Sequence, residues 1–331
     1  MAAADAARPD RLTILAFLAV VVLGGSNAIA VKASVAELDP LWSAAARFLA
    51  AGILLSAGVL LTRRPIPRGK SFSGAILYGL FAFAGSYGFI YFAIRDVPAG
   101  TVMVLISLVP LFTFGLAILH GQERFHAQGL VGASIALGGV AVVVADQLGA
   151  AVPFGSLLLV LVGVVFVAES GVILKWVPRA DPFATNGVGM LAGGGVLAML
   201  SVVSGETSAL PATVGVWAAV GYLVVGGSIV MFGLYLFALR RWTASAVSYV
   251  TLLMPMVTVP FAAVLFGEQI SPTFVAGGAV VLVGVYVGAF LKIRPRRSSA
   301  ISLPECLPPD ACAEPAMPSV GLAAAGTTGR P

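Results

Sequence analysis

Two ionisable residues stand inside long apolar stretches of this chain and are the first candidates for chemistry. Glu169 lies in the apolar run of residues 154–175, and Arg47 lies in the run of residues 41–61. If these runs span a membrane, an ionised carboxylate costs about 2.5–3.5 kcal/mol at the helix centre, so such residues are usually functional. Glu169 is therefore a candidate for proton coupling or for binding a substrate amine. A hydrogen bond within helix packing is the alternative.

Arg47 is predicted near the outer end of its run, where a long side chain can carry its charge to the membrane surface. The second interpretation is functional. In that case the guanidinium forms an anion site, or it is a partner for Asp39 or for a substrate carboxylate. The sequence leaves both interpretations open.

Neutral polar residues form a second group of candidates. Ser26 and Asn27 take the positions of Glu169 and Ser170 when the two halves of the chain are aligned on the lysines at positions 32 and 175. Buried hydroxyl and amide groups need hydrogen-bond partners in an apolar environment. A bound substrate or a neighbouring helix would supply them, so Ser26, Asn27 and Ser170 are candidate substrate-binding or coupling residues.

Two prolines, Pro110 and Pro255, lie near the middle of matching apolar runs. Each removes one backbone hydrogen bond and frees the carbonyl four residues earlier. A kinked helix with free carbonyls is tolerated where it lines a cavity. These two helices are therefore predicted cavity walls, with Ser107 and Thr251 nearby. A kink that only shapes the bundle is the alternative.

Among the tyrosines, Tyr87 is a candidate for stacking on a substrate or hydrogen-bonding to it. Tyr91 and Tyr235 lie near predicted helix ends, where an interfacial anchoring role is expected. The histidines, His120 and His126, share one short loop. Two histidines are too few for a metal site, so we interpret them as polar loop residues and expect neither a metal nor a cofactor.

The elements that must position these residues are indicated by composition. The chain has 59% hydrophobic and 10% charged residues and a net charge of +5. A soluble globular domain carries about 25% charged residues, so the lipid bilayer is the expected surrounding of most of this chain. The basic residues form no stripe that would meet a phosphate backbone, which argues against a nucleic-acid partner.

Ten apolar runs are long enough to span a bilayer as helices, for which about 20 residues are needed. They cover residues 11–32, 41–61, 73–94, 98–119, 127–146, 154–175, 183–203, 215–238, 244–266 and 272–291. The runs are continuous rather than alternating, and backbone groups in lipid must bond internally, so each run is predicted to be a helix. The predicted fold class is an all-α integral membrane protein with ten transmembrane helices.

The distribution of positive charge predicts the orientation. With the N-terminus inside, only Lys32 and Arg95 of the 19 lysines and arginines fall on the outside, and only Arg47 lies in the interior of a span. The positive-inside rule therefore places both termini in the cytoplasm. The first run also has the features of a signal peptide, with small residues at Ala28 and Ala30. A retained helix is expected, because cleavage would remove a partner from the repeat described next.

The chain contains an internal repeat. With a shift of 145 residues, positions 93–140 lie over 238–285 without a gap; Pro110 meets Pro255, and Glu123 meets Glu268. Each repeat holds five helices, an odd number, so the second copy enters the membrane from the opposite side. Such a 5+5 inverted repeat suits alternating access, although a duplication can also simply enlarge a bundle.

Four parts of the chain follow from the repeat. They are a cytoplasmic N-terminus (1–10), a first five-helix repeat (11–146), a second five-helix repeat (147–291) and a disordered cytoplasmic tail (292–331). The tail is rich in Pro, Ala and Ser and holds no apolar run long enough to bury. Gly284-x-x-x-Gly288 and Gly189-x-x-x-Gly193 favour close helix packing, and a homodimer surface is a further expectation.

The motifs together resemble the EamA branch of the drug/metabolite transporter superfamily over residues 11–291. The resemblance rests on Gly24-Gly25-Ser26-Asn27 with Lys32, on Ala46-Arg47-Phe48, and on the stretches Tyr91–Glu123 and Tyr235–Glu268. It implies a 5+5 inverted repeat, a central cavity between the halves, and secondary transport, often export, of small metabolites such as amino acids. The chain departs from the family pattern at Gly24, where tryptophan is frequent, and at Glu169, where many relatives are uncharged.

The leading hypothesis is a secondary transporter of a small metabolite in the cytoplasmic membrane, with alternating access and proton coupling. A membrane-embedded enzyme or a non-transporting scaffold is the alternative. An enzyme should cluster several ionisable groups inside the membrane, and this chain offers only Glu169 and Arg47 there. A channel should show repeated rings of charge, which the sequence lacks.

Overall fold

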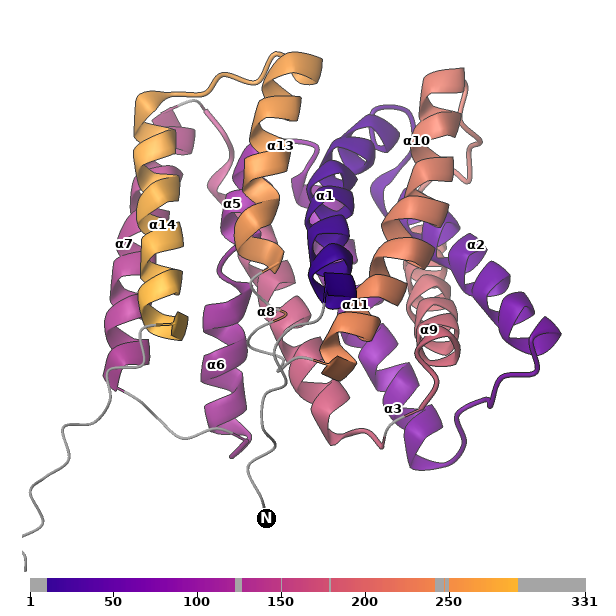
Figure 1. The fold of residues 1–331 in the computed structure, drawn as a ribbon. Coiled ribbons are helices and arrows are strands. Elements are labelled where there is room, and N and C mark those ends of the chain that lie inside the picture. The colour runs from indigo at the N-terminus through magenta and orange to yellow at the C-terminus, as the bar shows by residue number, and fades with distance from the viewer. Residues whose placement is uncertain are drawn as a thin grey trace, which may run out of the picture. The chain divides into compact units, whose positions relative to one another are not determined.

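The computed structural model describes residues 11–122, 127–149, 151–178, 180–241, 247 and 250–290. The regular elements in these ranges are helical (Figure 1). In chain order they are α1 (Arg11–Ser34), α2 (Pro40–Leu61), α3 (Lys70–Gly79), η1 (Leu80–Gly85), α4 (Ser86–Ala93), α5 (Ala99–Ile106), α6 (Val109–Leu119), α7 (Ala127–Gly149), α8 (Phe154–Trp176), α9 (Pro182–Val203), α10 (Val214–Val224), η2 (Val225–Val230), α11 (Met231–Arg241), α13 (Val250–Phe266) and α14 (Pro272–Phe290). The predicted N-terminal segment and C-terminal tail, and Glu123, Arg124 and His126, lie outside the described residues.

The membrane spans agree with the predicted ten. Seven helices within the described ranges are long and apolar enough to cross a membrane. They cover Arg11–Ser34, Pro40–Leu61, Lys70–Ala93, Ala99–Leu119, Phe154–Trp176, Pro182–Val203 and Val214–Leu239. The other three predicted spans contain shorter apolar helices, Val131–Asp146, Val250–Phe266 and Pro272–Val287. The all-helical fold class is therefore confirmed.

Two of the spans contain a π-helical segment at matching positions of the repeat. The third span runs as α3, η1 and α4, and the eighth runs as α10, η2 and α11. The segments η1 (Leu80–Gly85) and η2 (Val225–Val230) are separated by the 145-residue shift of the sequence repeat. π-Helical residues make up well under 1% of the residues in soluble proteins and are frequent at functional sites. Their recurrence shows that the two halves share one structural plan.

The fourth span is interrupted, whereas the described part of its repeat partner is not. α5 ends at Ile106, α6 begins at Val109, and Pro110 occupies the first turn of α6. A proline is tolerated there because N–H groups in the first turn have no partner within the helix. In contrast, Pro255 lies inside α13, which continues from Val250 to Phe266. The structure thus shows a break beside Pro110 and no helix end at Pro255.

Close packing joins equivalent helices of the two repeats. α2 packs along α9, and α7 packs along α14 (Figure 1). Glycines permit these approaches: a Cβ added to Gly139 would lie 2.6 Å from the Val281 nitrogen of α14, and one added to Gly194 would lie 3.0 Å from the Leu49 nitrogen of α2. Gly193 faces α3, where an added Cβ would lie 2.6 Å from the Gly79 carbonyl oxygen. Gly189 and Gly284 also face helices of this same chain. These glycines therefore serve packing within the chain, and the homodimer remains a prediction without support from them.

Loops of the two repeats bond to each other at one end of the bundle, where α1, α4, α9 and α13 end. We call this the Lys32 end. The Glu206 carboxylate, in the loop after α9, accepts hydrogen bonds from the backbone N–H groups of Leu41 (3.1 Å) and Trp42 (2.8 Å). These N–H groups belong to the first turn of α2, where the helix itself supplies no acceptor. The two repeats are therefore held together at this end by helix capping.

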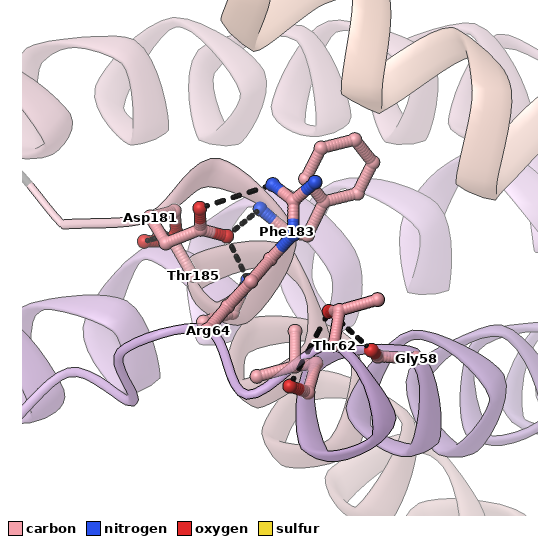
Figure 2. A network of polar contacts seen from close by, with 8 residues as sticks. Gly58, Thr62, Arg64, Asp181, Phe183 and Thr185 are labelled. Atoms are coloured by element: carbon pink, nitrogen blue, oxygen red, sulfur yellow. Dashed lines mark hydrogen bonds and ion pairs between the residues drawn. The ribbon is translucent and has the colours of Figure 1, made fainter.

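The opposite end, where α2, α6 and α8 end, is the His120 end. There Asp181 caps α9 by accepting hydrogen bonds from the N–H groups of Phe183 and Ala184 (Figure 2). The same carboxylate forms an ion pair with Arg64, with an N–O distance of 3.3 Å. The Arg64 guanidinium also lies over the Phe183 ring, 4.6 Å from its centroid. The loop after α2 is thereby joined to the start of α9.

Candidate functional site

A cavity of about 150 Å³ lies among helices of both repeats. Its wall is formed by α1, α3, η1, α4, α5, α6, α8, α11 and α13. The polar and aromatic residues on the wall are Asn27, Thr113, Ser170 and Thr251, and Tyr78, Tyr87, Phe232 and Tyr235. The remaining wall is aliphatic or contains methionine and glycine, and none of the residues that form it is charged. The cavity therefore offers an apolar surface with a few neutral polar groups.

Four of the predicted site residues line this cavity: Asn27, Tyr87, Ser170 and Thr251. Pro110, Pro255 and Ser107 do not line it, so their expected place on the wall is corrected. Ile106 and Thr251, which lie four residues before the two prolines, are both on the wall. The two proline-containing helices contribute neighbouring residues to the wall. Ser107 is fully buried and donates its hydroxyl to the Val104 carbonyl.

Ser26 points away from the cavity, in contrast to Asn27. Its hydroxyl donates to the Val22 carbonyl at 2.7 Å and contacts the Tyr222 hydroxyl. Ser26 is not among the wall residues of the cavity, and its hydroxyl contacts α10 instead. The prediction that Ser26 contributes to the site is therefore corrected, and its role is packing between α1 and α10.

Asn27 is a wall residue with an unsatisfied acceptor. Its side chain is 5% exposed, and its Oδ1 atom has no hydrogen-bond partner among the described residues. The oxygen faces Gly227 of η2, where an added Cβ would lie 2.7 Å from Oδ1 and 3.2 Å from Arg47 Nη2. A buried acceptor without a partner costs about 1–3 kcal/mol. A donor on a bound molecule would recover that cost, as would a donor from another conformation of the protein.

Arg47 is fully buried and holds the π-helical segment η2. Its Nε donates to Ser228 Oγ at 2.8 Å, Nη2 to the Gly227 carbonyl at 2.9 Å, and Nη1 to the Tyr91 hydroxyl at 3.2 Å. Its guanidinium carbon also lies 5.0 Å from the ring centroid of Tyr87, a wall residue. The planar guanidinium suits these three acceptors because it holds several N–H donors in a fixed geometry.

Two of the interpretations of Arg47 are wrong. The side chain does not extend to the membrane surface, because the residue is 0% exposed. It does not pair with Asp39, because that carboxylate accepts hydrogen bonds from the N–H (2.8 Å) and hydroxyl (2.7 Å) of Thr207. Binding of a substrate carboxylate stays a prediction, although Arg47 is not on the cavity wall.

Glu169 lies beside the cavity rather than on its wall. The Glu169 Oε1 atom is 3.3 Å from Nε2 of His120, which caps the end of α6. Oε2 is buried and has no partner among the described residues. His120 also packs edge-on against Trp176, with ring centroids 5.1 Å apart. His120 therefore contacts the Glu169 carboxylate and is not only a polar loop residue.

The Lys32 end of the cavity is held by an ion pair across the repeats. Lys32 Nζ lies 2.9 Å from Glu268 Oε1. Glu268 also accepts hydrogen bonds from the N–H groups of Ala99 (2.8 Å) and Gly100 (3.2 Å) at the start of α5. A carboxylate at a helix N-terminus is favoured by the unpaired N–H groups and by the helix dipole. One side chain thus joins α1, α5 and the loop after α13.

Two carboxylates in the loop after α1 are stabilised in their charged form. The Thr213 hydroxyl, together with the N–H groups of Thr213 and Ala212, lowers the pKa of Glu37. The Thr207 hydroxyl and N–H lower the pKa of Asp39. Hydrogen bonds to the ionised form are the physical cause in both cases. The donors belong to the loop after α9, so the two ionised acids join loops of different repeats at the Lys32 end.

Sequence reasoning missed several residues of this region. Tyr91 and Tyr235 are not interfacial anchors, because Tyr91 is fully buried against Arg47 and Tyr235 lines the cavity. Gly227 carries no sequence signal that separates it from other glycines in the chain. The pairing of Lys32 with Glu268 had a signal, since these opposite charges sit at the ends of apolar runs and each recurs in the other repeat, as Lys175 and Glu123.

Comparison with known proteins identifies the family. The model of a family described as "EamA-like transporter family" matches residues 11–145 and again residues 154–289. The chain belongs to the EamA-like transporter family. Its two matched segments correspond to the two structural repeats. The EamA assignment and the names of the relatives identify a membrane transporter of the drug/metabolite transporter superfamily and not an enzyme.

Relatives of this EamA-like transporter are similar over nearly their whole length. The chain is 31% identical to the "Uncharacterized inner membrane transporter YedA" of Escherichia coli strain K12, over 82% of this chain and 89% of that protein. It is 25% identical to a "Probable amino-acid metabolite efflux pump" of Salmonella typhimurium, over 86% and 97%. A solved structure titled "Crystal structure of protein" has the same fold, with a TM-score of 0.62 and 20% identity over 86% of this chain and 99% of the other.

Proposed function

We propose that this protein is a secondary transporter that moves a small amino-acid-like metabolite by alternating access. The supporting observation is the cavity, whose wall is built from helices of both inverted repeats. Contacts between helices hold the bundle together at both ends. Lys32 contacts Glu268 at one end, and His120 contacts Glu169 at the other. In alternating access, the two ends open in turn around one fixed site.

The cavity wall favours a substrate without net charge. No wall residue is charged, so an ion would lose its hydration without gaining a counter-charge there. Tyr78, Tyr87 and Tyr235 supply flat apolar surface, and the Asn27 carbonyl oxygen supplies an acceptor. A neutral molecule with a hydrogen-bond donor, or a zwitterion whose ammonium donates to Asn27, fits this chemistry.

The direction and driving ion are also proposals. Export is supported by the printed name of the Salmonella relative, a probable efflux pump. A cytoplasmic location of both termini is supported by the positive charge on the loops of the His120 end. Coupling to protons is supported by the intramembrane ion pair of Glu169.

Uptake into proteoliposomes tests this function. The panel contains neutral, acidic and basic radiolabelled amino acids, each measured with and without a pH gradient. We expect transport of neutral members only, with accumulation when a pH gradient is present. A hydrogen bond to a charged group contributes about 1.5–3 kcal/mol, so Asn27→Ala should raise KM by about 10- to 100-fold.

Ser26→Ala is the matched control for Asn27→Ala. It removes the neighbouring polar group on α1, whose hydroxyl bonds outside the cavity. We expect its KM to stay close to that of the wild type. Absence of transport for the whole panel would contradict the proposed function, and preferential uptake of acidic or basic amino acids would contradict the proposed substrate class.

A further inference from the structure

The contact between His120 and Glu169 joins two cavity-lining helices at the His120 end of the bundle. His120 follows the last residue of α6, and Glu169 lies in α8; the two helices lie side by side (Figure 1). The side chains are 29% and 15% exposed, and Nε2 and Oε1 are 3.3 Å apart. The pair is therefore partly removed from water but retains a route to it.

The hydrogen bond on the other ring nitrogen of His120 determines how many protons the contact needs. His120 Nδ1 lies 2.9 Å from the Leu116 carbonyl oxygen. A carbonyl only accepts, so Nδ1 must carry a hydrogen, and a neutral imidazole then has a bare lone pair at Nε2. A lone pair and a carboxylate oxygen at 3.3 Å repel each other. The contact is attractive only if a second proton is present, either on Nε2 or on the Glu169 carboxyl.

Loss of that second proton would leave Glu169 poorly accommodated. Its Oε2 atom is already buried without a partner among the described residues. After deprotonation, Oε1 would face the Nε2 lone pair of His120. Neither carboxylate oxygen of Glu169 would then accept a hydrogen bond from His120. A buried charge without partners is costly. Deprotonation therefore favours separation of the two side chains and entry of water between them.

Other ionisable groups occur on the elements packed against α6 and α8. Within the described residues these are Lys70 and Tyr78 on α3, Tyr87 and Tyr91 on α4, Asp146 on α7, Tyr286 on α14, and Lys175 on α8 itself. Of the basic groups that the structure describes, only His120 forms an ion pair with Glu169. The number of protons bound at the contact is therefore set by His120 and Glu169 together.

Helices α6 and α8 also line the cavity, near the contact between His120 and Glu169. Ser170, which follows Glu169, lies on the cavity wall, as do Gly171 and Leu174 on the next turn of α8. Thr113, two turns before His120, is the wall residue of α6 nearest the pair in sequence. Separation of α6 from α8 at the His120 end would therefore widen the cavity toward that end.

We propose that His120 and Glu169 together bind the coupling proton, and that its release to the solution at the His120 end separates α6 from α8 and opens the cavity there. This inference rests on the proposed function, because it assigns the proton site and the moving helices of that transporter. With the proton bound, the pair holds the two helices together and this end is closed.

Trp176 is a built-in reporter of the proton on His120. Its ring meets the imidazole edge-on at 5.1 Å, and a protonated imidazole quenches indole fluorescence at contact. The other tryptophans are replaced (Trp42→Phe, Trp217→Phe, Trp242→Phe), and the purified protein is titrated from about pH 8.5 to about pH 5, the range in which histidine changes charge. We expect fluorescence to fall as pH falls, and the fall to disappear in His120→Phe.

Glu169→Gln distinguishes a shared proton from an independent histidine. Without the carboxylate, His120 Nε2 faces a neutral amide, so the fluorescence curve should differ from that of the wild type. Asp181→Asn is the matched control: it removes the carboxylate of the other ion pair at this end and should leave the curve in place. A Glu169→Gln curve that coincides with that of the wild type would overturn the shared site, as would a wild type without any pH response.

The helix movement is measured with spin labels at Leu119→Cys and Trp176→Cys, on a background with Cys306→Ala and Cys312→Ala. Both positions are exposed, at 81% and 63%. Electron–electron double resonance should show a longer inter-label distance at high pH than at low pH. In Glu169→Gln the distance should stay short, because the amide still donates to Nε2.

An unchanged distance across the pH range in the otherwise unmodified protein would overturn the opening step. Neither the titration nor the distance measurement uses a substrate. Failure of the uptake panel would therefore count against the proposed transport function alone, and failure of these two measurements would count against the proton site alone.

Discussion

One packed unit beside the cavity consists of Asn27, Arg47 and Gly227, and the position of each depends on the other two. Arg47 bonds to the Gly227 carbonyl, and the missing side chain of Gly227 leaves room for the Asn27 carbonyl oxygen. The guanidinium has no acidic partner among the described residues, and it is held by neutral acceptors and by the rings of Phe48 and Tyr87. A neutral hydrogen-bonded cage of this kind fixes the position of η2 and of Asn27 on the cavity wall.

Gly227→Ala should disrupt this unit. The new methyl group would lie 2.7 Å from Asn27 Oδ1, and overpacking of this kind typically costs about 1–3 kcal/mol. We expect a lower melting temperature in detergent and a raised KM in the uptake assay. Gly221→Ala is the control on the same span, because its Cβ would meet nothing within 4 Å. Equal behaviour of the two variants would refute the packing argument.

The helices of this protein are interrupted where they meet the site. η1 and η2 recur at the repeat spacing, and η2 carries both acceptors that bind Arg47 from the eighth span, Gly227 and Ser228. Ser228 also donates its hydroxyl to the Leu223 carbonyl five residues earlier at 2.8 Å, which satisfies a carbonyl that a π-helical turn displaces. The break between α5 and α6 lies directly beside the wall residues Ile106 and Val109.

Glu268→Gln should loosen the Lys32 end. The amide keeps the size of the carboxylate but loses the ion pair with Lys32 and the favourable charge at the start of α5. A partly exposed pair of this kind contributes about 1 kcal/mol or less, so access to the cavity should rise up to about fivefold. The readout is the labelling rate of Val31→Cys, a wall residue next to Lys32, by a membrane-impermeant maleimide in a protein without Cys306 and Cys312.

Glu206→Gln serves as the matched control for Glu268→Gln. Glu206 also caps a helix at the Lys32 end, but it caps α2 and does not contact Lys32. We expect little change in the labelling of Val31→Cys. If both substitutions accelerate labelling equally, closure depends on helix capping in general and not on the ion pair.

The loop contacts of Glu37 and Asp39 should make stability depend on pH. Hydrogen bonds lower the folded pKa of both groups below their ordinary values of 4.5 and 3.8. Their contribution is therefore complete above those values and is lost as pH falls through the folded pKa. Thr207→Ala combined with Thr213→Ala removes the donor hydroxyls, so the melting-temperature difference from the wild type should be largest above about pH 5 and shrink toward about pH 3. A difference independent of pH would contradict this.

The molecule as a whole is two five-helix halves whose matching helices pack on each other. α2 packs along α9 and α7 along α14, while the cavity takes its wall from helices of both repeats. Ion pairs and capping contacts close the bundle at two ends, and each set involves different helices. Contacts on different helices at the two ends suit the proposed alternating access.

The two cysteines of the chain test the orientation of the whole molecule. Cys306 and Cys312 both lie in the tail that follows the last span. With the C-terminus in the cytoplasm, an impermeant maleimide should label them only after the cells are permeabilised. Ser208→Cys, in the exposed loop after α9 at the Lys32 end and on a background with both native cysteines replaced by alanine, should be labelled in intact cells. The reverse pattern would invert the proposed topology.

Several features of this protein follow from the sequence alone. Long apolar runs must be helical in lipid because backbone groups there have no other partner, and the 145-residue repeat indicated two inverted halves before any coordinates. Polar residues inside those runs were candidates for a substrate site, and Asn27, Ser170 and Thr251 lie on the cavity wall. These inferences succeed because apolar length, repeat spacing and residue type are local properties of the chain.

The tertiary structure decided which polar side chains meet. Ser26 faces another helix, Glu169 pairs with His120, and Arg47 turns inward to Gly227. A partner is set by the rotation of each helix about its axis and by the helix that packs against it. The rotation changes by about 100° per residue, and the π-helical segments shift it further within the third and eighth spans. Asn27 and Gly227 lie 200 positions apart in the sequence, and only helix packing brings Gly227 against the side-chain carbonyl oxygen of Asn27.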